Sequence, residues 1–265
     1  MNTPQGLYPH AGTGFWRTHA LWPLLLFLLV FAVIEVLGLD RPIAEALYFN
    51  RVTGHWLGTG GGDWWAHELL HDGGRWLVRG VAALALFTWL ASFVLPAVRG
   101  WRQTAGFMAL AMVLSVTIVG SLKAITNVDC PWDLAGFGGH QPYVSLFADR
   151  PDYLSPARCF PGAHASSGFA LVAGYFAWRD RSPAWARALL GAGLLLGCVF
   201  AIGQEARGAH FLSHDLAGAA IVWSAQLALY AAWQRTRSRA VQRARRTARE
   251  HRVDQDSGDT ALAAD

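Results

Sequence analysis

The sequence HFLSHD, residues 210–215, places two histidines and an aspartate at the start of an apolar run. His210 and His214 are four residues apart, so they share one face if the segment is helical, and Arg207 lies three residues before His210. A nucleophilic histidine must be neutral with its second ring nitrogen held by an acceptor, and an arginine can bind phosphate oxygens through two hydrogen bonds. His210 could be such a nucleophile, with His214 or Asp215 as the acceptor that holds its ring, and Arg207 could bind phosphate. A metal site made of His210, His214 and Asp215 is the alternative, and a structural cluster is the third interpretation.

A second candidate is the sequence PGAH at residues 161–164. Pro161 and Gly162 end the preceding loop, and the sequence from Ala163 onward is typical of a helix N-terminus. The first turn of a helix offers unpaired backbone N–H groups and the positive end of the helix dipole, which together bind phosphate. Gly162 and Ala163 leave room for an anion, and His164 could give or take a proton beside it. We expect a phosphate-binding helix start here; the alternative is a polar cap with a histidine at the membrane interface.

A third candidate is Lys123, the one lysine among 22 basic residues. It follows the apolar run MALAMVLSVTIVGSL. A lysine in this position could simply extend its ammonium group to the membrane interface. Because the sequence uses arginine everywhere else, a specific requirement for a compact ammonium group is plausible. We therefore expect Lys123 to contribute to an anion site.

The elements that must position these residues are membrane helices. The chain of 265 residues is 53% hydrophobic and only 15% charged, compared with about 25% charged in an ordinary soluble domain. A helix needs about 20 apolar residues to cross a bilayer. Six segments approach that length, at about 20–39, 77–95, 104–122, 165–178, 187–203 and 214–233. The sequence thus predicts an all-α integral membrane protein with a six-helix bundle over residues 1–233. Glu35 within the first segment argues against a cleaved signal peptide.

The distribution of arginine predicts the orientation of these helices. Arginines lie in the connections near 98–103 and 179–187 and throughout residues 234–265, and basic loops favour the cytoplasmic side. We expect a multi-pass protein of a bacterial inner membrane with both termini in the cytoplasm and the other loops on the outer, periplasmic face. Residues 234–265 form a basic tail that is predicted to be disordered. No nucleic-acid-binding motif accompanies this tail, so we expect no nucleic-acid partner.

Two of the three cysteines, Cys130 and Cys159, fall in one predicted outward loop. An oxidising compartment would allow them to form a disulfide, which would clamp the loop. Cys198 lies in an apolar segment and is most simply a packing residue.

The sequence AHELLHDGG, residues 66–74, contains HExxH, a pattern by which a helix presents two histidines to zinc in proteases. The extended form of that pattern requires a third histidine three residues after its glycine, and Leu77 stands there. Tryptophans flank the segment, so we interpret it as an amphipathic helix at the outer membrane surface. His67 and His71 would then line the route of a lipid or contact water.

Taken in order, the first two motifs resemble those of the type 2 phosphatidic acid phosphatase superfamily, whose fold also serves vanadium haloperoxidases. The family has a lysine followed after six residues by Arg-Pro, and then Pro-Ser-Gly-His. In KAITNVDCP, Lys123 and Pro131 match and Cys130 replaces the arginine. In PGAH, Pro161 and His164 match, and Gly-Ala replaces Ser-Gly.

The third motif of that family is Ser-Arg, with a histidine six residues on and an aspartate four beyond. In QEARGAHFLSHDLAG, His210 matches the family's nucleophile and Gln204 replaces the arginine. His214 stands at the aspartate position, and Asp215 follows one residue late. The resemblance covers roughly residues 104–233 and implies the six-helix fold of the family.

The resemblance also implies the chemistry. It implies that His210 attacks phosphorus, that His164 protonates the leaving group and then helps activate water, and that no metal or other cofactor takes part. Lys123, the backbone near residues 162–164 and substitute arginines, Arg207 and Arg158, would bind the phosphate. The implied function is hydrolysis of a lipid phosphate or an isoprenoid or lipid pyrophosphate, with a membrane lipid as substrate. Transfer of the phosphoryl group to another lipid is a close variant. The missing motif arginines favour a third possibility, a transporter or assembly factor with a degenerate site.

Overall fold

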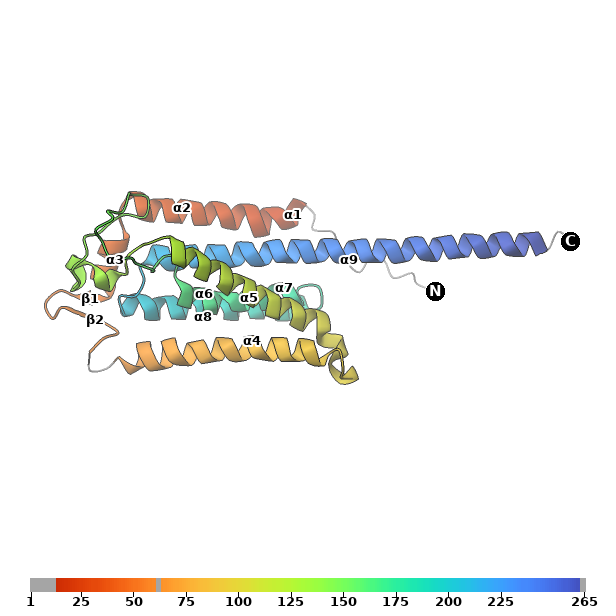
Figure 1. Ribbon diagram of the computed structural model, residues 1–265, viewed down its shortest axis with the longest axis horizontal. Coiled ribbons are helices and arrows are strands. Elements are labelled where there is room, and N and C mark those ends of the chain that lie inside the picture. The colour runs from red at the N-terminus through yellow and green to blue at the C-terminus, as the bar shows by residue number, and fades with distance from the viewer. Residues whose placement is uncertain (1–12, 61–62, 263–265) are drawn as a thin grey trace. The chain divides into compact units, whose positions relative to one another are not determined.

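The computed structural model describes residues 13–60 and 63–262, and this part of the chain is mostly helical (Figure 1). The N-terminal half contains α1 (Thr13–Trp16), the π-helical turn η1 (Arg17–Leu21), α2 (Trp22–Val36), α3 (Asp40–Leu47), the antiparallel strands β1 (Phe49–Asn50) and β2 (His55–Trp56), the π-helix η2 (Trp65–Gly73), α4 (Gly74–Ala91), the 3-10 helix η3 (Pro96–Trp101) and α5 (Arg102–Ile125). The C-terminal half contains η4 (Pro131–Asp133), η5 (Ala135–Phe137), α6 (Ala163–Phe169), η6 (Ala170–Val172), α7 (Ala173–Trp178), α8 (Pro183–Ala206) and α9 (Leu212–Leu262).

Among the described residues, four helical segments are long and apolar enough to cross a membrane. They are Thr13–Val36, Pro96–Ile125, Pro183–Ala206 and Leu212–Arg243. The segments expected at 77–95 and 165–178 are not among them, so this count does not confirm the six-span prediction. Two arginines lie in the first turns of α4, and the stretch from α6 to α7 is divided by a 3-10 turn and is short for a bilayer.

The HExxH sequence lies in η2, which continues directly into α4. Gly73 and Gly74, where the two elements meet, both have helical backbone angles. The segment is therefore continuous with a longer helix, and the structure does not confirm the separate amphipathic helix expected from the sequence. A Cβ atom on Gly74 would lie 2.4 Å from the Phe200 ring, so this glycine allows the helix to pack closely against α8.

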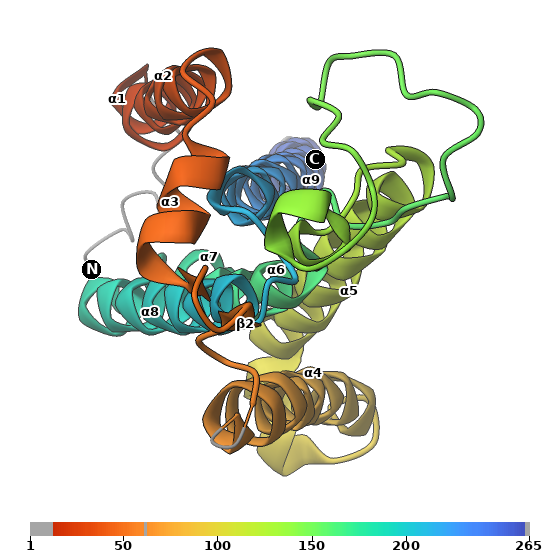
Figure 2. The ribbon, with the colours of Figure 1, turned by 90° about the vertical axis from the view of Figure 1, so that its left-hand side faces the viewer.

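Small residues allow the helices around the site to approach closely. Figure 2, viewed along the helices, shows α6 between α5 and α8. A Cβ atom on Gly168 of α6 would lie 2.9 Å from the Cα atom of Gly197 in α8, and one on Gly218 of α9 would lie 2.3 Å from Ser166 Oγ of α6. Close backbone contact of this kind is typical of helices packed in membranes. It brings the start of α6 next to the start of α9.

An apolar cluster at one end of the bundle joins three loops. Its buried members are Ala44, Phe49, Trp56, Leu134, Phe137 and Phe211. The backbone N–H of Trp132 donates a 2.9 Å hydrogen bond to the carbonyl of Gly208. Gly208 has φ of +72°, and a Cβ atom there would lie 2.3 Å from the Trp56 ring. The loops that carry the candidate residues are therefore packed against one another at the same end of the bundle.

Residues 13–227 belong to one compact unit, and the part of α9 from Ala228 onward belongs to another. In the second unit the helix continues through residues 234–262, for which the sequence predicted disorder. Alanine and arginine, which dominate the first part of this stretch, are strong helix formers. Residues 263–265 of the predicted tail lie outside the described residues.

Candidate active site

His210 and Asp215 form a buried pair at the start of α9. His210 Nδ1 lies 2.6 Å from Asp215 Oδ1, and the two side chains are only 4% and 2% exposed. Burial, together with the positive charges of Lys123 and Arg207, holds the pKa of His210 well below its ordinary value. A neutral ring that donates from Nδ1 to the carboxylate has its lone pair on Nε2. Of the two acceptors that the sequence offered, Asp215 is the one that contacts His210.

Asp40, at the start of α3, fixes the first turn of α9. Its carboxylate accepts a 3.0 Å hydrogen bond from the backbone N–H of Ser213 and a second from the Ser213 hydroxyl. Burial raises the pKa of Asp40, and these hydrogen bonds oppose the shift. The sequence does not predict this role for Asp40, because an aspartate at the start of a predicted helix indicates a cap on that helix and not on a distant one.

Gly162, at the start of α6, contacts the His210–Asp215 pair. Its backbone N–H donates a 2.8 Å hydrogen bond to the carbonyl of His214. A Cβ atom on Gly162 would lie 2.0 Å from Asp215 Oδ1 and 2.9 Å from His210 Nδ1. Only glycine fits here without displacing the pair. The N–H of Gly162, which was expected to bind phosphate, is therefore engaged with the protein itself. Ala163 is the first residue of α6, so the remaining N–H groups of this helix start lie beside the buried pair.

His164 is enclosed by aromatic rings in the first turn of α6. Its ring centroid lies 4.5 Å from that of His71 and 4.6 Å from that of Phe200. His164 Nε2 lies 3.1 Å from the carbonyl oxygen of Leu70. Burial is the main cause that lowers the pKa of His164 to about 4; the Leu70 carbonyl opposes it, and nearby positive charges add to it. His164 is therefore neutral in the free protein, with Nε2 as donor and Nδ1 as acceptor.

Lys123 lies in the last turn of α5, half-buried. Its ammonium group interacts electrostatically with Asp215, His210 and His214. The structure therefore places Lys123, the sole lysine, on the same side of the site as the buried pair.

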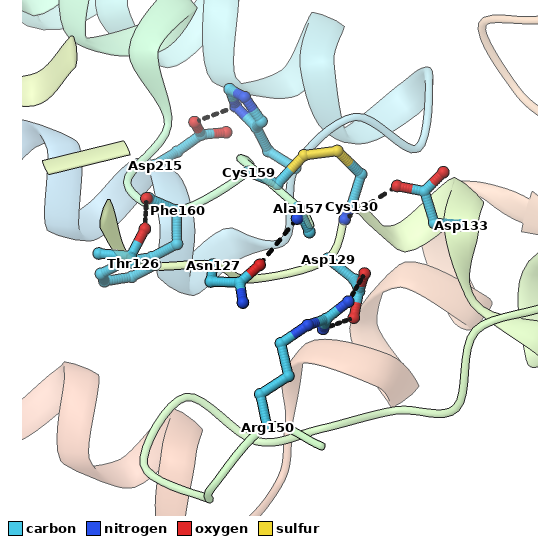
Figure 3. Close-up of a disulfide and its surroundings, with 11 residues drawn as sticks. Thr126, Asn127, Asp129, Cys130, Asp133, Arg150, Ala157, Cys159, Phe160 and Asp215 are labelled. Atoms are coloured by element: carbon cyan, nitrogen blue, oxygen red, sulfur yellow. Dashed lines mark hydrogen bonds and ion pairs between the residues drawn. A yellow bond between two sulfur atoms is a disulfide. The ribbon is translucent and has the colours of Figure 1, made fainter. Parts of the chain in front are cut away.

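The end of α5 is tied to the segment that leads into α6 (Figure 3). A disulfide joins Cys130 to Cys159, with Cα atoms 5.1 Å apart. The backbone N–H of Ala157 donates a 2.8 Å hydrogen bond to Asn127 Oδ1, and the Thr126 hydroxyl donates to the carbonyl of Phe160. These contacts hold Lys123 and the start of α6 in register. The cysteine that replaces the family's arginine at position 130 thus forms a covalent cross-link.

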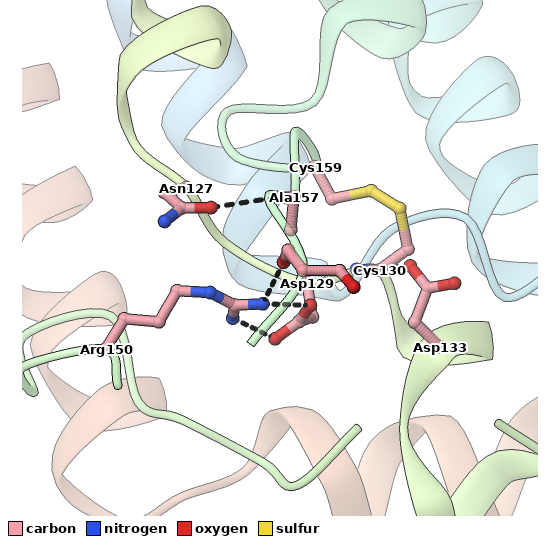
Figure 4. A network of polar contacts seen from close by, with 8 residues as sticks. Asn127, Asp129, Cys130, Asp133, Arg150, Ala157 and Cys159 are labelled. Atoms are coloured by element: carbon pink, nitrogen blue, oxygen red, sulfur yellow. Dashed lines mark hydrogen bonds and ion pairs between the residues drawn. A yellow bond between two sulfur atoms is a disulfide. The ribbon is translucent and has the colours of Figure 1, made fainter. Parts of the chain in front are cut away.

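A buried ion pair steadies the loop beyond the disulfide (Figure 4). Arg150 donates hydrogen bonds to both carboxylate oxygens of Asp129, and the two side chains are 9% and 7% exposed. Arg150 also donates to the carbonyl of Ser155 at 2.7 Å. The sequence does not predict this pair, because residues 21 positions apart in a loop give no periodic signal.

The two arginines expected to replace the motif arginines differ in position. Arg207 is half-buried, and its charge acts on the pKa values of His71, His164 and His210. Its Nη1 atom is buried without a hydrogen-bond partner among the described residues. Arg158 is exposed, and within the same part of the chain no hydrogen bond or ion pair joins it to the site. Arg207 is therefore the better substitute.

His214 is buried beside the pair but faces other groups. Its ring stands edge-on to Phe160 and Phe211, and its centroid lies 6.2 Å from that of His210. Together with Asp40, it lines a small cavity behind the site. In residues 13–60 and 63–262, no three histidine, cysteine, aspartate or glutamate side chains are grouped so that they could hold a metal ion.

Two residues of the HExxH helix and one of α8 complete the cluster. His71 Nδ1 lies 3.1 Å from the side-chain nitrogen of Gln204, and Arg75 donates a hydrogen bond to His71 Nε2. His67 instead lies 3.7 Å from Asp72. The sequence predicts only that His71 lies along the route of the lipid or in contact with water. Its four-residue spacing from Arg75 was the signal that could have indicated a shared face.

The chain was compared with known protein families, with curated proteins and with solved structures. A comparison with curated proteins and one with solved structures give no match. A family profile described as the PAP2 superfamily matches residues 104–238, which is just over half of the chain. The matched region runs from α5 into α9 and contains Lys123, His164, His210 and Asp215. The chain belongs to the PAP2 superfamily.

Proposed function

We propose that the protein is a membrane phosphatase that hydrolyses a lipid phosphate or lipid pyrophosphate through a phosphohistidine on His210, at the outer face. Membership of the PAP2 superfamily supports phosphatase or phosphotransferase activity in general, and the apolar helices support a membrane location. The observation that carries the proposal is the buried His210–Asp215 pair, which lies among Lys123, Arg207 and the N-terminus of α6.

In the first step, the lone pair on His210 Nε2 attacks phosphorus and the bond from phosphorus to the leaving oxygen breaks. Asp215 accepts the Nδ1 hydrogen bond and stabilises the positive charge that develops on the ring. Lys123, Arg207 and the first N–H groups of α6 bind the phosphoryl oxygens.

His164 supplies the proton for the leaving oxygen. The ring is neutral in the free protein, because its pKa is about 4. A phosphate group bound beside it raises this pKa through its negative charge. A substrate that binds as the monoanion can deliver to His164 the proton that His164 then passes to the leaving oxygen. In the second step, neutral His164 accepts a proton from water as that water attacks the phosphohistidine. Inorganic phosphate then leaves, and His210 is regenerated.

The proposal is tested by phosphate release from a panel of lipid phosphates and pyrophosphates by the purified protein. The His210→Ala variant should be inactive, whereas His140→Ala, an exposed histidine of a loop at the same end, should retain wild-type activity. Trapping of an acid-labile phosphoenzyme in the wild type, but not in the His210 variant, would support the intermediate. Robust turnover by His210→Ala would refute it.

Two outcomes would redirect the assignment. If a chelator removes activity and zinc restores it, a metal-dependent mechanism replaces the phosphohistidine. If the phosphoenzyme forms but discharges only when a second lipid alcohol is added, the protein is a phosphotransferase.

A further inference from the structure

The HExxH helix brings a second cationic group to the site, on the side of His164. Arg75, in the first turn of α4, lies near enough to lower the pKa values of His164, His71 and Arg207. Lys123, by contrast, acts on His210, His214 and Asp215. The positive charge of the site thus falls into two groups, one around the nucleophile and one around the proposed acid.

A chain of hydrogen bonds fixes Arg75 in this position. A guanidinium can only donate, so His71 Nε2 is the acceptor of the hydrogen bond from Arg75 and the His71 proton is on Nδ1. Nδ1 lies 3.1 Å from the amide nitrogen of Gln204, so the amide must be turned by 180° for its oxygen to accept the Nδ1 proton. His71 is therefore neutral, which agrees with its pKa of about 4, lowered mainly by burial.

This chain begins at the position where the family pattern has an arginine. Gln204 is 3% exposed and carries no charge, so it cannot bind phosphate as a cation. Through His71, however, it holds the guanidinium of Arg75, which comes from another helix. The arrangement restores a cation to the site from outside the three motifs.

Arg75 and Arg207 are like charges close enough to depress the pKa of Arg207. Asp72 offsets part of this repulsion: its carboxylate lies 3.8 Å from Arg75 and also acts on Arg207. One Arg207 nitrogen is nevertheless buried without a partner among the described residues. Two neighbouring guanidinium groups that repel each other favour an anion bound between them, and arginine binds phosphate oxygens in a fork geometry.

We propose that Arg75, held by His71 and Gln204, binds an anionic leaving group, and that the preferred substrate is a lipid diphosphate. The inference rests on the proposed function. His164 protonates the leaving oxygen, so a cation on its side faces the leaving group. When His210 attacks the terminal phosphorus of a diphosphate, the leaving group is a lipid monophosphate, and Arg75 contacts its oxygens. A monophosphate substrate releases a neutral alcohol, which has no anionic oxygens for Arg75 to bind.

The test compares two substrates that differ by one phosphate, farnesyl diphosphate and farnesyl monophosphate, by initial rates of phosphate release. The wild type should have the higher kcat/KM for the diphosphate. Arg75→Met should reduce this preference roughly 10- to 100-fold, the range for losing a hydrogen bond to a charged group. The matched control is Arg79→Met, one turn along α4, where the guanidinium lies over the Trp76 ring at 5.3 Å. This variant should keep the preference.

His71 is a positioning residue in this scheme, and its test has the same readout. His71→Ala should lower the diphosphate preference as Arg75→Met does, whereas His67→Ala should not. Arg75→Lys should restore only part of the preference, because an ammonium group lacks the fork geometry. Equal losses of activity on both substrates in Arg75→Met, or no loss, would overturn the proposal.

A binding measurement keeps this inference separate from the proposed function. Inorganic pyrophosphate should raise the melting temperature of the wild type more than inorganic phosphate does, and Arg75→Met should abolish the difference. A wild type that binds both anions equally would overturn the inference even if lipid phosphatase activity is established. A pyrophosphate preference that depends on Arg75 would support it even if His210→Ala showed the catalytic assignment to be wrong.

Discussion

Replacing Gly162 with alanine tests whether the start of α6 and the His210–Asp215 pair are fitted to each other. The added Cβ atom would lie 2.0 Å from Asp215 Oδ1, whereas ordinary van der Waals contact begins at 3.4 Å. The carboxylate or the helix start must therefore move by more than an ångström. The 2.6 Å hydrogen bond to His210 cannot persist through such a displacement.

The expected effect combines two terms. Overpacking of a tightly packed site destabilises by about 1–3 kcal/mol, and loss of a hydrogen bond to a charged group by about 1.5–3 kcal/mol. Gly162→Ala should therefore reduce the free energy of unfolding by about 2.5–6 kcal/mol. Activity should fall by about 10²–10⁴, because the nucleophile is displaced and its tautomer is no longer fixed.

The assay is phosphate release together with thermal unfolding of the protein in detergent. Gly191→Ala in α8 is the matched control, because a Cβ atom there meets nothing within 4 Å. This control should retain wild-type activity, and its stability should equal or slightly exceed that of the wild type.

A double-mutant cycle identifies the cause. If the clash is with the carboxylate, Gly162→Ala should be much less destabilising in an Asp215→Ala background than in the wild type. Equal destabilisation in both backgrounds would refute the reasoning. The cycle also bears on two departures from the family pattern, glycine in place of serine at 162 and aspartate one residue late at 215. The geometry indicates that these are one coupled change.

Three further predictions concern stability. Asp40→Ala should lower the free energy of unfolding by about 1–3 kcal/mol, since it leaves the start of α9 without its acceptor; a melting temperature equal to that of the wild type would contradict this. Cys130→Ser, or reduction, should destabilise by about 3–4 kcal/mol, because the disulfide closes a loop of 29 residues, and Cys198→Ser is the control. Because His71 and His164 have folded pKa values of about 4, against an ordinary 6.5, the unfolded chain binds more protons between these values. Thermal stability should therefore be complete above pH 6.5 and fall as pH drops towards 4, and a melting temperature that is constant over this range would be contrary to the prediction.

The sequence predicts the end of the helix on which each candidate residue falls, because each lies next to an apolar run. It could not choose between His214 and Asp215 as the partner of His210. That choice depends on how the chain turns between α8 and α9, and Asp40 fixes this turn from a helix more than 170 positions away. The number of spans was harder still. The α6–α7 stretch is apolar enough to suggest a span, but a 3-10 turn divides it, and this turn packs closely against α8: a Cβ atom on Gly193 would lie 2.7 Å from the backbone nitrogen of Val172.

The HExxH sequence shows how a local pattern can lie beside the candidate site without forming the arrangement that the pattern suggests. The zinc pattern requires both histidines on one metal, but His67 lies near Asp72, while His71 contacts Gln204 and Arg75. The pattern contains no information about Gln204, which is 133 positions away from His71. Gly74 is what allows the helix to approach α8 closely enough for that contact. A second signal was present in the sequence: the family's third motif lacks its arginine, and a site that binds phosphate must replace that charge from somewhere. Searching the neighbouring predicted outward loop for an arginine one helical turn from a histidine would have pointed to Arg75, the residue that we propose for this role.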